Sequence, residues 1–144
     1  MADPASAAAR FVLDACALIA FFNDEEGAGN FEQLIAQAEA GEAQLYIASV
    51  NLYEVYYDAL RRGPADKAEA LLRDLYALPI TVVETIDPPL MRRAGYFKTT
   101  HRVSVADSIA LALAQQLGAL LVSTDHHEFD ALEKAGTAHF FWLR

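Results

Sequence analysis

The chain has 144 residues, of which 54% are hydrophobic and 22% are charged, a composition typical of one compact domain rather than of a disordered chain. Its net charge is −9, with 11 Lys and Arg residues against 20 Asp and Glu residues, so it lacks the broad basic surface that non-specific nucleic-acid binding normally uses. A single cysteine, Cys16, excludes an intramolecular disulfide and a cysteine-based zinc site, and favours a reducing setting.

Residues 1–9 are predicted to form a flexible tail, and residues 10–144 a single folded domain. The tail has neither the basic leader nor the leucine-rich stretch of a secretory signal. No apolar run in the chain approaches the ~20 residues that cross a bilayer. We therefore expect a cytoplasmic protein without a membrane partner.

Short apolar segments alternate along the chain with longer segments of helical periodicity. In chain order we predict a strand over residues 11–14, helices over 17–22 and 30–40, a strand over 45–48, helices over 49–62 and 64–78, a strand over 80–84, helices over 88–99 and 104–116, a strand over 119–122, a helical turn after Asp125 and a last strand over 138–142. Ser49 and Asp87 are expected to be N-caps, and Gly41 and Gly118 to end helices. The alternation predicts a three-layer α/β/α fold around a mostly parallel sheet of four to five strands.

Four carboxylates interrupt segments that otherwise have the composition of buried core: Asp14, Glu54, Asp107 and Asp125. An unpaired ionised carboxylate in a dry interior is costly, so four of them call for a shared explanation. Asp14 and Asp125 end predicted strands, whereas Glu54 and Asp107 lie in the first two turns of helices. Because ligands bind outside the carboxyl ends of parallel strands, we expect the four acids to converge there on a divalent cation.

Asp107 and Asp125 each have a structural alternative. The sequence Ser104-Val-Ala-Asp107 matches a capping box, in which the acid accepts a hydrogen bond from the amide of the N-cap residue. Asp125 is well placed to cap the helical turn that follows it. Either role is compatible with metal ligation, and taken singly neither residue decides between the two.

Glu54 and Asp14 are harder to explain structurally. Glu54 lies between Val50 and Tyr57 on an apolar stripe of its helix, which favours a buried or cleft-facing position over a solvated one. Asp14 is followed by eight residues without a polar side chain other than the thiol of Cys16, and it has few structural roles except to cap the next helix. The case for a site depends mainly on Asp14 and on the ordered set of four.

Other chemically active residues are predicted to be structural. Cys16 lies in an apolar run with no base nearby in sequence, so we expect a core residue rather than a nucleophile. His126 and His127 have neither the spacing nor the companions of a zinc site.

The four acids lie in the segments FVLDACALIA (11–20), ASVNLYEV (48–55), VSVADSIALA (103–112) and LVSTD (121–125). In this order and on this α/β alternation, the segments resemble those of PIN-domain proteins, most closely the VapC-type toxins of bacterial toxin–antitoxin pairs. The resemblance spans nearly the whole chain, from Phe11 onward. It implies that the four acids form a quartet that holds Mg²⁺ or Mn²⁺ and that the protein is a metal-dependent endoribonuclease.

Further expectations follow from the resemblance. Asp14 and Asp107 would be direct ligands, with Glu54 and Asp125 as outer ligands or water-orienting groups. RNA phosphates would contact basic residues at the rim of the site, for which the candidates are Arg61, Arg92, Lys98 and Arg102. The likeness also implies a homodimer and a cognate antitoxin that blocks the acidic site, and the negative net charge suits a basic partner.

The sequence departs from the resemblance just after the first aspartate. Ala15 and Cys16 stand where the family usually has Thr or Ser, so a hydroxyl that would orient Asp14 or a metal-bound water is missing. Two other interpretations stay open: an RNA-processing PIN nuclease without an antitoxin, and a non-catalytic PIN-like interaction module, which the missing hydroxyl favours.

Overall fold

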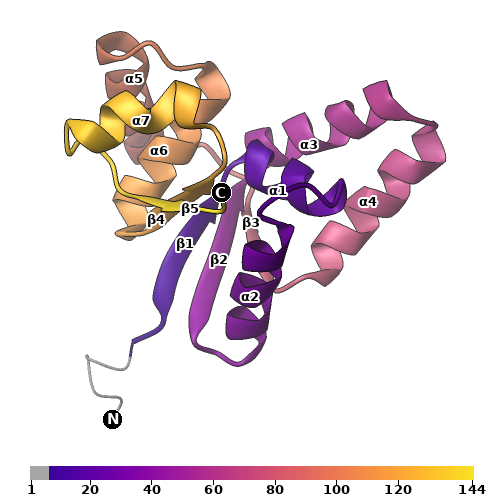
Figure 1. Ribbon diagram of the computed structural model, residues 1–144. Coiled ribbons are helices and arrows are strands. Elements are labelled where there is room, and N and C mark those ends of the chain that lie inside the picture. Colours follow the sequence, from indigo (N-terminus) through magenta and orange to yellow (C-terminus); the bar gives the residue numbers. More distant parts are fainter. Residues whose placement is uncertain (1–6) are drawn as a thin grey trace.

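Five parallel strands form one sheet in the computed structural model, which describes residues 7–144 (Figure 1). In chain order they are β1 (Ala9–Leu13), β2 (Ala43–Ala48), β3 (Ile80–Val83), β4 (Leu120–Ser123) and β5 (Phe140–Trp142). Their order across the sheet is β3-β2-β1-β4-β5, so β1 lies in the centre, paired with β2 and β4. The predicted parallel sheet is confirmed.

Helices cover both faces of the sheet, as a parallel sheet requires. They are α1 (Ala15–Phe22), α2 (Ala28–Glu39), α3 (Ser49–Arg62), α4 (Ala65–Ala77), α5 (Pro88–Thr100), α6 (Val105–Leu117) and α7 (His126–Lys134). The pleat of β1 directs Leu13 to a core shared with α1 and α2, and Val12 to a core shared with α5, α6 and α7. Figure 1 shows these two groups of helices on opposite sides of the strands. The predicted three-layer α/β/α architecture is therefore confirmed.

Helix α6 is buried around most of its circumference. Its buried residues include the unbroken run 108–114, and it packs against the sheet on one side and against α5 on another. An apolar surface on all sides is typical of an interior helix. Because α6 leads into β4 and runs antiparallel to the strands, its first turn, which carries Asp107, lies at the carboxyl edge of the sheet.

The predicted helix caps are confirmed at Asp87 but not at Ser49. The Asp87 side chain accepts a hydrogen bond from the Leu90 amide at 2.9 Å. Ser49 is instead the first residue of α3, and its hydroxyl donates to the Glu84 carbonyl oxygen at 3.5 Å. The N-cap position belongs to Ala48, because β2 passes into α3 without an intervening loop. Gly118 ends α6 in the left-handed conformation, as predicted.

The chain's first strand begins earlier than the sequence pattern indicates. Ala9, placed in the tail by the sequence, pairs with Ala43 in the sheet, and residues 1–6 of that predicted tail lie outside the described part of the chain. Within residues 7–144, no helix combines the length and apolar character needed to traverse a bilayer.

Candidate active site

Asp14 lies at the junction of β1 and α1 and is 1% exposed. Its Oδ1 accepts a hydrogen bond from the Ala17 amide at 2.8 Å, so it is the N-cap of α1. Its own amide donates to the Val122 carbonyl oxygen at 3.2 Å, which ties the junction to β4. The second oxygen, Oδ2, is buried and has no hydrogen-bond partner among the described residues. Capping therefore accounts for one carboxylate oxygen of Asp14; the nearby Ser123 hydroxyl lowers the pKa of the carboxyl but does not meet hydrogen-bond geometry with the other oxygen.

Glu54, Asp107 and Asp125 reach the same edge of the sheet from three other elements, and all three are half-buried. Glu54 lies in the second turn of α3, which follows β2, and Asp125 is the N-cap of α7, which follows β4. Asp107 is the third residue of α6. The Asn51 side chain of α3 donates to the Ala106 carbonyl oxygen at 3.3 Å, so the first turn of α6 adjoins α3. The fold thus brings the four predicted acids into one region.

The electrostatics of the four acids are coupled. Burial raises the pKa of Asp14 to about 7, and the charges of Asp107 and Asp125 add to this shift, while the Ser123 hydroxyl and the Ala17 amide oppose it. Burial likewise raises the pKa of Asp107 to about 7. A cluster of this kind favours either protons or a cation over free charge.

The same coupling extends to Glu54 and to Glu128. Burial raises the pKa of Glu54, against the opposing effect of the Asn51 and Tyr57 side chains. After burial, the charges of Glu128, Glu54 and Asp125 raise the pKa of Asp107 further, while the Ser104 hydroxyl opposes the shift. Glu128 is therefore a fifth carboxylate within electrostatic range of the site.

The side chains as they stand do not form a closed metal-binding group. Among residues 7–144, no three His, Cys, Asp or Glu side chains are arranged to hold one metal ion together. Mg²⁺ does not require this, because it keeps several waters and is bound directly through one or two carboxylates. The buried Oδ2 of Asp14, which has no hydrogen-bond partner among the described residues and is subject to the charges of Asp107 and Asp125, fits such a cation. Ligation by the quartet stays a prediction.

The capping box predicted at the start of α6 is only half formed. The Ser104 hydroxyl accepts a hydrogen bond from the Asp107 amide at 3.1 Å, as expected. The Ser104 amide, however, donates to Oε1 of Glu128 at 3.3 Å and not to Asp107. The reciprocal bond of the capping box, from the Ser104 amide to the Asp107 carboxylate, is therefore not made.

Two residues near the site, Glu128 and Asn51, are not predicted from the sequence, whereas Ser123 is visible there as a hydroxyl beside Asp125. Asn51 and Ser123 are fully buried polar residues, and Oδ1 of Asn51 has no hydrogen-bond partner among the described residues. Asn51 could have been found as a lone polar residue on the apolar face of its helix, one turn before Glu54. Glu128 gives a misleading signal, because Asp125-His-His-Glu128 itself resembles a capping box.

The residues after Asp14 supply no hydroxyl, but a neighbouring strand does. Ser123 at the end of β4 lies close enough for its hydroxyl to lower the pKa of Asp14, and it also accepts a hydrogen bond from the Asp125 amide at 3.0 Å. Burial raises the pKa of the Cys16 thiol well above its usual value, and the four carboxylates raise it further. Cys16 therefore stays protonated, in agreement with its predicted lack of nucleophilic character.

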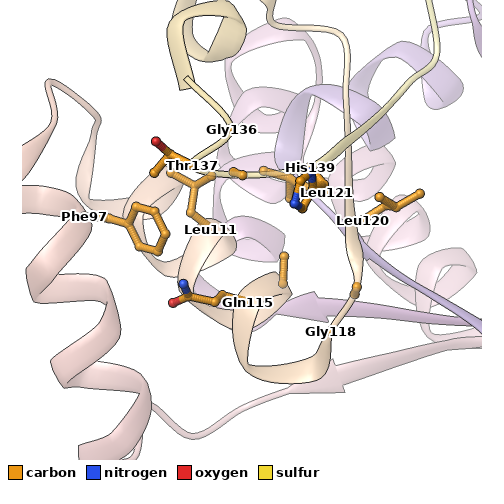
Figure 2. Close-up of a pocket in the computed structure, with 12 residues that line it drawn as sticks. Phe97, Leu111, Gln115, Gly118, Leu120, Leu121, Gly136, Thr137 and His139 are labelled. Carbon is orange, nitrogen blue, oxygen red and sulfur yellow. The ribbon is translucent and has the colours of Figure 1, made fainter. Parts of the chain in front are cut away.

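Two cavities lie on the α5–α7 side of the sheet. Figure 2 shows one of about 440 Å³ at the amino end of β4, where Leu111, Gln115 and His139 face it; it contains none of the four acids. The other, a cleft of about 470 Å³ between residues 101–103 and α7, includes Glu128 and thus adjoins the acidic region. Its lining residues are His101, Arg102, Val103, His127, Glu128, Ala131, Leu132 and Ala135.

Two of the four basic residues proposed for the rim have contacts within the protein. Lys98 donates to the Val103 carbonyl oxygen at 2.8 Å, and the Arg61 guanidinium lies 4.8 Å from the centre of the Tyr57 ring. Arg102 is exposed and lines the cleft beside the acidic region. Of the four, Arg102 has the clearest position for contact with a ligand there.

Together, the fold and the site define an α/β domain with a carboxylate cluster at the carboxyl edge of a parallel sheet. The PIN domain family model matches residues 11–135, so the chain belongs to the PIN domain family. No curated protein matches the sequence.

Several solved structures share this fold. VapBC of Salmonella typhimurium, bound to DNA, matches with a TM-score of 0.73 and 17% identity, over 94% of this chain and 99% of that one. VapC20 of Mycobacterium tuberculosis, described as a toxin that cleaves the sarcin–ricin loop, matches with a TM-score of 0.64 and 17% identity, over 89% of this chain and 95% of that one. A protein of Pyrobaculum aerophilum matches with a TM-score of 0.62 and 23% identity, over 94% of this chain and 92% of that one. At these identities the likeness establishes the fold.

Proposed function

We propose that this PIN-domain protein is a metal-dependent endoribonuclease and the toxin of a type II toxin–antitoxin pair. The observation that carries the nuclease proposal is the buried, unpaired Oδ2 of Asp14 in a cluster with three other carboxylates. Such an arrangement is costly for a protein that uses it only for structure. A hard divalent cation offsets that cost and suits an all-oxygen donor set.

In this proposal Asp14 and Asp107 bind Mg²⁺ or Mn²⁺ directly, and Glu54 and Asp125 are outer ligands or orient water. When bound, such a cation lowers the pKa of an attacking water and stabilises the charge that develops on the leaving oxygen. Asp14 contributes a rigid ligand, because the Ala17 amide and the β1–α1 junction fix its carboxylate. The Ser123 hydroxyl, beside Asp14, takes the place of the hydroxyl that Ala15 and Cys16 lack.

We propose that the substrate strand of RNA passes over the cleft between residues 101–103 and α7. Arg102, His101 and His127 line it, and its carboxylate Glu128 already accepts a hydrogen bond from the Ser104 amide. On a chain of net charge −9, the Arg102 guanidinium with two imidazole rings beside it is a favourable place for a phosphodiester backbone. The cleft adjoins the acidic region, as the strand to be cut must.

The toxin assignment and the partners depend on likeness to the toxin–antitoxin structures. A groove of about 400 Å³ between α1, α3 and α4, with Ile19, Val55 and Leu71 in its lining, suits an apolar segment of an antitoxin. A guanidinium of that partner would be attracted to the acidic cluster. We also propose a homodimer, since large apolar side chains are exposed on α3, α5 and α6: Tyr53, Met91, Tyr96 and Val105.

Cleavage of RNA by purified protein tests the nuclease proposal. We expect cleavage with Mg²⁺ or Mn²⁺, none with EDTA, and a loss of at least 100-fold in Asp14→Asn and Asp107→Asn. Asp66→Asn, an exposed acid of α4, is the matched control and should cleave as the wild type does. Absence of cleavage, or cleavage that both site variants retain, rejects the nuclease assignment and leaves the interaction module.

Expression in bacterial cells separates a toxin from an RNA-processing enzyme. A toxin should arrest growth, and co-expression of a small protein encoded beside it should relieve the arrest. Active protein that leaves growth unchanged supports the processing nuclease instead.

A further inference from the structure

We propose that Glu128 is a positioning residue for Asp107. It accepts the hydrogen bond from the N-cap amide of α6 that Asp107 would otherwise accept, and so keeps the Asp107 carboxylate available to the site. The inference rests on the proposed function, because it concerns the availability of Asp107 to a cation. It starts from the half-formed capping box of α6, in which the Ser104 hydroxyl binds the Asp107 amide but the Ser104 amide binds Glu128.

In an isolated helix with this sequence, the third residue would serve the N-cap amide itself. The Asp107 carboxylate would then accept a hydrogen bond from the Ser104 amide, which would compete with a cation for it. In the folded protein Oε1 of Glu128, from α7, lies 3.3 Å from the Ser104 nitrogen and accepts that hydrogen bond. The Ser104 amide at the N-cap of α6 thus has its hydrogen-bond acceptor in α7, and the Asp107 carboxylate is not needed for that bond.

Glu128 is itself available for this contact because a second capping box is also opened. Asp125 caps α7 by accepting a hydrogen bond from the Glu128 amide at 3.1 Å. The reciprocal bond, from the Asp125 amide to Glu128, is not made, because the Asp125 amide donates to the Ser123 hydroxyl at 3.0 Å. Because Ser123 binds the Asp125 amide, the Glu128 carboxylate is not needed there and binds the Ser104 amide. Because Glu128 binds the Ser104 amide, the Asp107 carboxylate is not needed for that hydrogen bond. We call this pair of replaced hydrogen bonds the relay.

This relay predicts that loss of the Glu128 hydrogen bond weakens cation binding without direct contact between Glu128 and the cation. In Glu128→Ala the Asp107 carboxylate is expected to turn to the Ser104 amide, which then competes with the cation. Substitutions in groups that orient metal ligands typically cost roughly 10–100-fold in metal affinity. In Glu128→Gln the side-chain amide oxygen can still accept the bond from Ser104, so the position of Asp107 is retained although the charge is lost.

Calorimetric titration with Mn²⁺ tests the relay. We expect Glu128→Ala to bind Mn²⁺ at least tenfold more weakly than the wild type, and Glu128→Gln to stay within about threefold. Glu133→Gln, which removes another charge from α7, is the matched control and should bind as the wild type does. Equal affinity in Glu128→Ala overturns the inference, and so does an equal loss in Glu128→Gln, since charge alone would then explain it. A wild-type protein that does not bind Mn²⁺ contradicts the proposed function as well.

A second measurement needs no metal. In EDTA, either acid alone can satisfy the Ser104 amide, so the fall in Tm of Glu128→Ala combined with Asp107→Ala should exceed the sum of the two single changes. Additive changes in Tm would show that the two carboxylates do not substitute for each other, and would overturn the relay independently of the titration.

Discussion

At Asp14, one carboxylate oxygen caps α1 through the Ala17 amide, whereas the other is buried without a partner among the described residues. Asn would cap the helix as well as Asp does. The charge of Asp14 is therefore not needed for the local structure, and in the metal-free protein it opposes folding. This separation of the two roles makes Asp14 the most informative single residue of the site.

The pH dependence of stability follows from the pKa of Asp14, which is about 7 in the folded protein against a usual value of 3.8. Between these two values the folded state holds a proton that the unfolded state has released, so the contribution of this group is greatest below about pH 4 and is lost as the pH rises to about 7. In EDTA, Asp14→Asn should therefore raise the free energy of unfolding at pH 8 by on the order of 2 kcal/mol and have less effect at pH 5.

Urea unfolding at pH 5 and pH 8 measures this prediction. Asp66→Asn, on the exposed surface of α4, should leave the pH dependence unchanged. An Asp14→Asn variant that is destabilised equally at both pH values would show that the carboxylate is not under strain in the metal-free protein.

Arg102 is the residue at which the proposed RNA path is most directly tested. In a protein made inactive by Asp107→Asn, Arg102→Ala should weaken binding of single-stranded RNA by roughly 3–10-fold at 0.1 M salt, and should lower the salt dependence by about 0.7 in the log–log slope. Arg73→Ala on exposed α4 is the matched control. If the two variants have the same RNA affinity, the strand does not pass over the cleft.

The sequence identifies some of these residues and not others for a physical reason. Asp14 and Asp107 are visible because a carboxylate inside an apolar run is anomalous wherever the run folds. Glu128 acts through a hydrogen bond to the Ser104 amide, and this bond crosses from α7 to a residue 24 positions away in the chain. Such contacts depend on how α6 and α7 pack, which no local pattern encodes.

At the scale of elements, direct strand-to-helix junctions position the site. β1 passes into α1 through Asp14 alone, and β2 passes into α3 without a loop. This explains the wrong prediction at Ser49, because the cap position is occupied by the last residue of the strand. Element type follows from periodicity and is correctly predicted along the described chain. The boundaries of the elements are predicted less accurately. For example, α7 is a helix of nine residues rather than the predicted short turn.

The segment between α1 and α2 offers a test of the packing between elements. Gly27 has a φ of +99°, and a Cβ at this position would lie 2.9 Å from the Leu143 carbonyl oxygen. Gly27→Ala should therefore lower the free energy of unfolding by about 1–3 kcal/mol. Gly29→Ala, inside α2 with open space around it, should instead be neutral or stabilising by up to about 1 kcal/mol. Similar effects in both variants would contradict the described contact with Leu143.

At the scale of the whole molecule, the sheet order explains why acids far apart in sequence meet. The strands β2, β1 and β4 are neighbours, so the segments that leave their carboxyl ends deliver Glu54, Asp14 and Asp125 to one edge. Helix α6 adds Asp107 because it enters that edge from the opposite direction. The sequence supports the alternation of elements, but the order of strands across the sheet requires the folded structure.

The central claim is that Asp14 and Asp107 hold a divalent cation at this edge. A crystal structure of the protein with Mn²⁺, located by its anomalous signal, tests the claim most directly. We predict a single strong peak within about 2.5 Å of Oδ2 of Asp14 and of an Asp107 carboxylate oxygen. Crystals saturated with Mn²⁺ that show no peak at these atoms, or a peak only elsewhere on the acidic surface, would contradict the account.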